Sequence, residues 1–158
     1  MTAAIVARLG VPVLAVRCTD AAIDDDFDAF DAGVSSWEIV AITAILSSPS
    51  DQESRDLAGR NIRASRRATI AGTTDLKADR EGRADLIVEI PGATSLVVAG
   101  STVSINGAPA KAIAITDEAI QVADTDIRVW RIADVKDDRH PITRVRKFSV
   151  FLQEVGGV

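Results

Sequence analysis

The chain has no tyrosine, one histidine and one cysteine in 158 residues, and this scarcity argues against several classes of enzyme. A Ser-His-Asp site would have to use His140, which precedes Pro141 in a charged stretch typical of a surface loop. Cys18 has no second cysteine for an internal disulfide, which suits a reducing compartment. We interpret Cys18 as a small buried apolar side chain and expect no catalytic residues.

Motifs for phosphate and metal binding are also lacking. There is no GxxxxGK[ST] and no GxGxxG after an apolar run, so nucleotide binding has no support. The acidic residues between 20 and 31 do not follow the ligand spacing of an EF-hand loop. We therefore expect no cofactor and no metal, and interpret these carboxylates as a solvated loop or a contact to a basic partner.

No apolar run approaches the ~20 residues of a membrane-spanning helix, and the first residues do not have the pattern of a signal peptide. We therefore expect a soluble protein without a membrane partner. With 47% hydrophobic residues and 10 glycines, the composition is that of a globular protein. The length fits one domain over residues 1–158.

Short apolar runs alternate with turn signals, which predicts a mainly β fold: a small antiparallel β-barrel or sandwich. Strands are expected at 11–17, 37–46, 84–90, in a hairpin around Asn106-Gly107, near 127–135 and at 143–155. In the last of these, Phe148, Val150 and Leu152 share one face, and Lys147, Ser149 and Gln153 share a face expected to be solvated.

The strand that begins at Trp37 is apolar on both faces, which predicts that it is covered on both sides. A second copy of the chain could supply the second cover. Trp37, Ile39 and Ile45 are therefore candidate subunit-interface residues.

Residues 48–83 form the least regular part of the pattern and are predicted to be a long insertion. Ser50 or Asp51 could cap a helix with Glu53 in its first turn, while "RRATIAG" could be a strand. The segment is basic, in contrast to a net charge of −5 for the whole chain. Its arginines are candidate contacts to DNA phosphate or to carboxylates of a neighbouring subunit, the alternative being a solvated face: Arg55, Arg60, Arg63, Arg66 and Arg67.

The order of these features resembles the head–tail joining proteins of tailed phages, specifically the head-closure or stopper group. The resemblance rests on "VPVLAVRCTDAAIDDDFDAF", on Trp37 to Leu46 followed by Ser48-Pro49-Ser50, on residues 84–92, on "GSTVSINGAPAKAI" and on "RKFSVFLQEV". It touches most of the chain through motifs of low specificity. The span from Pro49 to Arg83 is longer than is usual in the group, and "AIQVADTDIRVWRIADV" looks like an addition.

The resemblance implies a virion structural protein of the neck, assembled in the host cytoplasm. It would form a homo-oligomeric ring, a hexamer or a dodecamer, between a portal or adaptor protein and a tail terminator or tail tube. DNA would pass through the ring, and residues 50–72 would be the candidate channel plug. Alternatives are another virion protein (tail terminator or capsid decoration) and a small OB-like nucleic-acid-binding module, with an unrecognised hydrolase as a more distant one.

Overall fold

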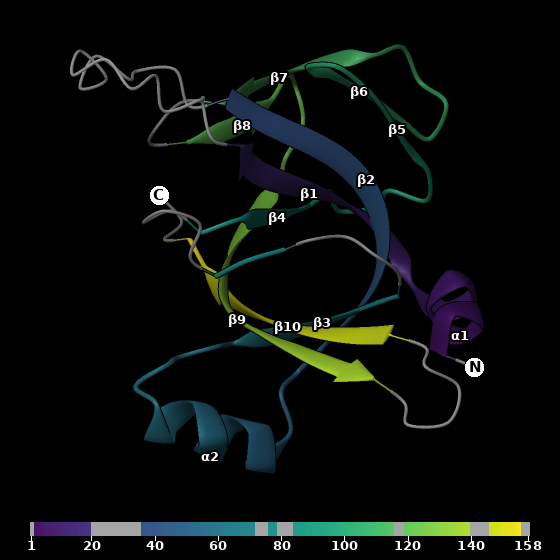
Figure 1. Ribbon diagram of the computed structural model, residues 1–158. Coiled ribbons are helices and arrows are strands. Elements are labelled where there is room, and N and C mark those ends of the chain that lie inside the picture. Colours follow the sequence, from purple (N-terminus) through teal and green to yellow (C-terminus); the bar gives the residue numbers. More distant parts are fainter. Residues whose placement is uncertain are drawn as a thin grey trace, which may run out of the picture.

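The structure is a computed structural model that describes residues 2–19, 36–71, 76–78, 84–115, 119–139 and 146–155. It is mainly β, as the alternation of apolar runs predicts, and Figure 1 shows a barrel below a smaller sheet. The helices are α1 (Thr2–Leu9) and α2 (Asp51–Gly59). The strands are β1 (Val11–Thr19), β2 (Ser36–Ser47), β3 (Arg66–Ala71), β4 (Leu86–Glu89), β5 (Leu96–Ala99), β6 (Thr102–Ile105), β7 (Lys111–Ile115), β8 (Ile120–Val122), β9 (Arg128–Arg139) and β10 (Arg146–Glu154).

Six strands close the barrel in the order β1-β2-β3-β10-β9-β4, and every neighbouring pair is antiparallel. The prediction of a loop insertion over residues 48–83 is therefore only partly right. A helix does form there, but residues 66–71 are β3, which joins β2 to β10 and without which the barrel would be open. The strand that the sequence allows at "RRATIAG" is confirmed as β3, and what the prediction missed is that this strand belongs to the barrel wall and not to an insertion.

Apolar side chains fill the barrel interior. Val13, Ile87, Ile132 and Leu152 are fully buried there, together with other inward residues of all six strands. Leu76 belongs to the same cluster. The interior is thus a packed core, as expected for a small barrel.

A second apolar cluster lies between the outside of the barrel and the four-stranded sheet β5-β6-β7-β8. Leu14 and Val88 contribute their outward side chains from the barrel, and Val103 faces them from β6. Trp37 and Ile39 pack against this cluster. The prediction that β2 is covered on both sides is confirmed over these two residues, where a sheet of the same chain supplies cover on the second side.

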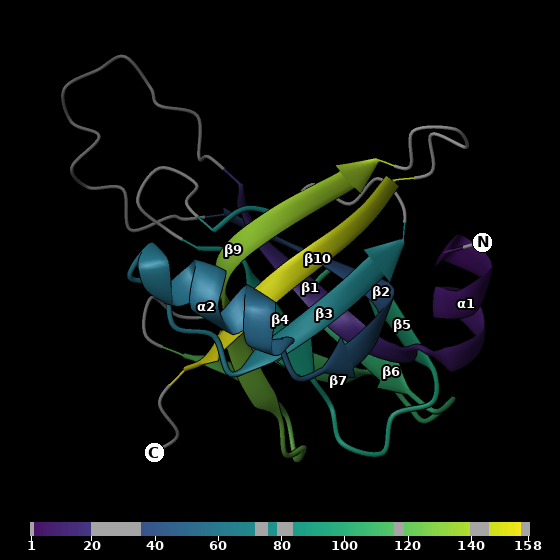
Figure 2. The same cartoon turned by 90° about the horizontal axis from the view of Figure 1, so that it is seen from below.

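The two helices cover other parts of the barrel's outside (Figure 2). α1 lies against β2 and β3 and buries Val6. α2 lies near β3, β10 and β9 in both views. The described helices include none that is long and apolar enough to cross a membrane.

The outward face of β10 differs from the predicted solvated face. Ser149 is 2% exposed and Phe151 is 3% exposed. The alternation itself holds along β10, because Val150 and Leu152 both lie in the barrel core and Gln153 is exposed as predicted. The register shift beside Phe151 adds a residue to β9 and not to β10. What differs is that α2, which lies near β3, β10 and β9, covers the outside of the barrel here. The side chains of Lys147 and Phe148 lie outside the described set.

The Asn106-Gly107 turn is confirmed, with φ of 52° and 74° at its two central residues. The Asn106 side chain also makes hydrogen bonds that the turn pattern does not predict. It accepts hydrogen bonds from the backbone N–H groups of Thr94 and Ser95 and donates one to the Gly92 carbonyl. It therefore ties the β6–β7 turn to the segment that precedes β5.

Candidate interaction surface

α2 begins with a capping box, as the Ser50 and Glu53 pattern predicts. The Ser50 hydroxyl accepts a hydrogen bond of 3.2 Å from the Glu53 backbone, and the Glu53 carboxylate accepts one of 3.0 Å from the Ser50 backbone. This reciprocal pair satisfies two of the N–H groups that a helix start leaves without partners. Both contacts lie within four residues of the chain, so the local sequence is enough to start the helix here.

Two ion pairs hold α2 against the barrel. Arg67 of β3 donates to Glu53 at 2.7 Å, and Arg60, just after the helix, donates to Asp134 of β9 at 2.5 Å. Phe151 pairs in register with both Arg67 and Asp134, so it lies between the two strands that carry these contacts. Leu57 is the buried residue of α2. The helix is thus a fixed cover over the outside of the barrel.

Burial alone would raise the pKa of Glu53, but the Ser50 backbone N–H and the Arg67 guanidinium outweigh it, so the pKa lies below its ordinary value. A lowered carboxyl pKa stabilises the folded state above the pKa of the unfolded chain, and this stability is lost as the pH falls through the folded pKa. We expect the protection factors of the α2 amides, which correct for the slower intrinsic exchange in acid, to fall at low pH before those of the barrel strands. Hydrogen exchange measured across the acid range checks this.

A matched pair of variants isolates Glu53 in that experiment. Glu53→Gln should remove most of the difference between the α2 protection factors at neutral and at acidic pH. Asp56→Asn, on the exposed face of the same helix, should leave it in place because Asp56 bonds only Gln52 among the described residues. If α2 lost the same protection in acid in both variants, Glu53 would not be the group whose protonation loosens the helix.

Trp130 is the centre of a second charged cluster at one end of the barrel. Its indole N–H donates to Glu89 at 3.1 Å, and Arg66 lies 3.6 Å from the same carboxylate. The guanidinium carbons of Arg66 and Arg128 lie 5.4 and 5.9 Å from the centre of the Trp130 ring. Such distances allow cation–π attraction. This end of the barrel is therefore closed by a tryptophan that two arginines flank.

The structure divides the five candidate arginines into two groups. Arg60, Arg66 and Arg67 bind carboxylates of their own chain. Arg55 and Arg63 are exposed and have no ion pair among the described residues. Three of the arginines therefore find their planar anion, a carboxylate, within the chain. The other two are available to an external partner.

The interpretation of residues 50–72 as a channel plug has to be revised in the same way. Residues 66–71 are part of the barrel wall, and 51–60 are held on it by the contacts above. The part that carries Arg55 and Arg63 is thus a structured surface. No loop that projects away from the barrel is described there.

The three candidate interface residues of β2 also have different positions. Trp37 and Ile39 are partly buried under the small sheet. Ile45 belongs to neither apolar cluster, pairs in register with Thr69 and is partly exposed, so it stays a candidate contact. His140 and the aspartates between 20 and 31 lie outside the described residues, as does the side chain of Cys18.

The described residues contain no group of three or more His, Cys, Asp or Glu side chains that could hold a metal ion. They do contain two open depressions on the small sheet. One of about 560 Å³ lies between β2 and β5–β7 and is lined by Trp37, Ile39 and Val98 among others. The other, of about 520 Å³, follows β8 and the turn after it. Neither joins an acid, a base and a nucleophile in the pattern of a catalytic site.

Comparisons of the chain with models of protein families, with curated proteins and with solved structures found no match.

Sequence reasoning missed the carboxylates that bind the arginines. Glu53 carried a signal, because its place three residues after Ser50 defines a capping box. Asp134 and Glu89 carried none. They lie 74 residues after Arg60 and 23 residues after Arg66, and only the closure of the barrel brings each acid to its arginine.

Proposed function

We propose that this protein is a non-enzymatic structural component of a virion neck, which forms a ring between a portal or adaptor and the tail. The proposal combines the sequence resemblance with a compact covered β-barrel, an architecture suited to a building block. The observation that carries it is the surface formed by Arg55 and Arg63. Both are exposed on a segment that the ion pairs of Arg60 and Arg67 fix to the barrel.

The packed interior bears on where DNA would pass. Because Leu152, Ile132 and Val13 are fully buried inside the barrel, a single copy offers no passage along its axis. A channel would have to lie between copies. A ring, and not the barrel itself, would therefore surround the DNA.

The local charge favours a neighbouring subunit over DNA as the partner of the two exposed arginines. Residues 51–67 carry five arginines and three acids, Asp51, Glu53 and Asp56, and three of the arginines already bind carboxylates. A surface that binds nucleic acid normally gathers more unneutralised positive charge. In this proposal Arg55 and Arg63 contact carboxylates of the next copy or of an adjoining neck protein.

The test is co-expression with the portal, adaptor and tail proteins encoded in the same genome, followed by electron microscopy of the necks. We expect the double variant Arg55→Glu, Arg63→Glu to lower neck occupancy by more than tenfold, since like charges across an interface cost several kcal/mol. The matched control is Arg131→Glu, an exposed arginine of β9 without an ion pair among the described residues.

Two results would count against the proposal. A wild-type chain that never enters a neck rules out the connector role, and equal occupancy for both charge reversals rules out the arginine surface. Tight, salt-sensitive binding of short DNA by the isolated monomer would favour the nucleic-acid-binding module instead. That module would need exposed aromatic platforms, whereas Trp130 is 3% exposed and Trp37 is partly covered.

A further inference from the structure

The exposed acids of the chain show where the two exposed arginines of a neighbouring copy would bind. Five exposed carboxylates make no ion pair among the described side chains: Asp51, Asp56, Asp124, Asp126 and Glu154. Asp51 and Asp56 lie on α2 itself, together with Arg55, and Glu154 is the last residue of β10. Of the five, only Asp124 and Asp126 line either of the two depressions on the small sheet.

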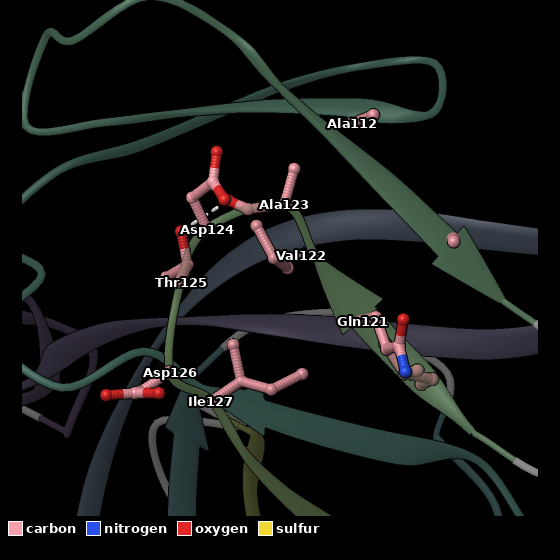
Figure 3. Close-up of a pocket in the computed structure, with 10 residues that line it drawn as sticks. Ala112, Gln121, Val122, Ala123, Asp124, Thr125, Asp126 and Ile127 are labelled. Carbon is pink, nitrogen blue, oxygen red and sulfur yellow. Dashed lines mark hydrogen bonds between the residues drawn. The ribbon is translucent and has the colours of Figure 1, made fainter.

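Their depression has a floor suited to the aliphatic part of an arginine. It measures about 520 Å³ and lies on the outward side of β7 and β8, where Ala112 and Ala114 are exposed. Ala123, directly after β8, adds a third methyl group, and Figure 3 shows Asp124 and Asp126 on the turn that follows. An arginine packs its methylene groups on apolar surface and keeps its charged end beside polar groups. The depression therefore offers both parts of such a site.

The turn that carries the two carboxylates is held by its own hydrogen bonds. The Thr125 N–H donates to the Val122 carbonyl at 3.2 Å, and the Thr125 hydroxyl donates to the Ala123 carbonyl at 2.9 Å. Lys111 of β7 donates to the Thr125 hydroxyl at 3.1 Å, and no ion pair joins it to either carboxylate. The two acids are thus presented on a structured turn, as the two exposed arginines are on their segment.

The surface around the depression has the composition of a contact. The outward side chains of the small sheet alternate with its buried ones, and none of them is charged: Val97, Ala99, Thr102, Ser104, Ala112, Ala114, Gln121 and Ala123. The cores of protein interfaces are depleted in charged residues, whereas their rims are polar. This face, with two aspartates at its border, follows the same arrangement.

We propose that Arg55 and Arg63 of one copy bind Asp124 and Asp126 of the next copy. The inference rests on the ring of the proposed function and names the acids that its two exposed arginines meet. α2 lies at one end of the molecule in Figure 1, and β8, from which the turn starts, lies at the other. Copies joined through these two ends are arranged head to tail, and such contacts close into a ring or extend as a filament.

The charges in this contact act mainly on the choice of partner. Each exposed ion pair contributes little affinity, so the uncharged face supplies most of the burial. Like charges across an interface are far more costly than the loss of a pair. Reversal of the charge on one side is therefore the informative change.

Two variants reverse one side of the contact each. The α2 variant, Arg55→Glu with Arg63→Glu, faces the two aspartates of the next copy with like charge. The turn variant, Asp124→Asn with Asp126→Arg, faces the two arginines with like charge, and asparagine is chosen because it tolerates the φ of 50° at position 124. We expect each variant alone to assemble more than tenfold more weakly than the wild type.

An equal mixture of the two variants is the decisive sample. The acidic α2 surface of one variant meets the basic turn of the other, and the remaining contact is the unchanged pairing of arginines with aspartates. We expect the mixture to assemble within about threefold of the wild type, as alternating copies. Misfolding of either variant does not predict this recovery. Glu154→Arg reverses an exposed acid outside the depression and should assemble like the wild type.

Two readouts are used: occupancy of co-expressed necks by electron microscopy, and sedimentation velocity of the purified chains over a concentration series. A mixture that assembles no better than its components, in a readout where the wild type assembles, overturns the contact. A largest species of two copies overturns the head-to-tail arrangement.

The same experiment separates this inference from the proposed function. If the wild type enters necks and the mixture does not recover, the neck role stands and the contact is wrong. If the wild type is absent from necks but the mixture recovers in sedimentation, the contact stands and the neck role is wrong. A wild-type chain that is absent from necks and monomeric at its highest soluble concentration overturns both.

Discussion

Replacement of Trp130 by alanine is expected to lower the free energy of unfolding by about 3–5 kcal/mol. Trp130 is 3% exposed and belongs to the barrel core, so the truncation leaves a large cavity at the end of the barrel. It also removes the ring that Arg66 and Arg128 flank and the indole N–H that donates a hydrogen bond to Glu89. Urea unfolding followed by circular dichroism measures the change.

Trp130→Phe is the matched control, because it keeps an aromatic ring and loses the indole N–H. We expect it to cost distinctly less, with the lost hydrogen bond accounting for about 1 kcal/mol. A loss below 1 kcal/mol in the alanine variant would show that the ring does not support the barrel end, contrary to its burial.

The second large effect is expected at Gly10, which joins α1 directly to β1. A Cβ atom there would lie 2.4 Å from the Val6 carbonyl oxygen and 2.5 Å from Cγ2 of Thr43. The Thr43 side chain can rotate, but the Val6 oxygen is backbone and accepts the Gly10 N–H at 2.8 Å. Gly10→Ala must displace α1 from β2, and we expect it to cost about 1–3 kcal/mol.

Gly59→Ala provides the control for that substitution. Gly59 ends α2, and a Cβ atom built there meets nothing within 4 Å. Alanine should be neutral or stabilise the protein by up to about 1 kcal/mol, because it restricts the unfolded chain and favours helix. Thermal unfolding of the two variants side by side checks both expectations. Equal midpoints would mean that α1 is not packed as described.

Most strands could be predicted because their signals lie in residues that are close together in the sequence. The run from Trp37 to Leu46 predicts β2 almost to its ends, and Asn106-Gly107 predicts the two positive φ angles of its turn. Ser50 and Glu53 predict the start of α2 for the same reason. Each of these signals involves residues within about one turn or one strand of each other.

Predictions that depended on distant partners were less successful. Ser149 was expected on a solvated face and is buried, since alternation along β10 says nothing about what covers it. The apolar outer face of β2 was read as a possible subunit contact, yet Trp37 and Ile39 meet the small sheet. A sequence shows that a surface needs a cover but not which part of the molecule supplies it.

The prediction for the arginines between residues 55 and 67 was limited in the same way. The sequence shows that this segment is basic, but it does not show which arginines bind carboxylates of their own chain. The structure shows this through the positions of three acids, Asp134, Glu89 and Glu53. Glu53 was within local reach, whereas the other two come from strands made neighbours by barrel closure.

By itself, the sequence determined that the protein is mainly β, where most strands and one helix begin, and where charge is concentrated or missing. These properties follow from local backbone preference and from the order of apolar and polar residues. Only the tertiary structure decided that β3 closes the barrel, which arginines are neutralised internally and that Asp124 and Asp126 border a depression. Those outcomes depend on which strands become neighbours, and pairing between distant strands is selected by the packing of the whole core.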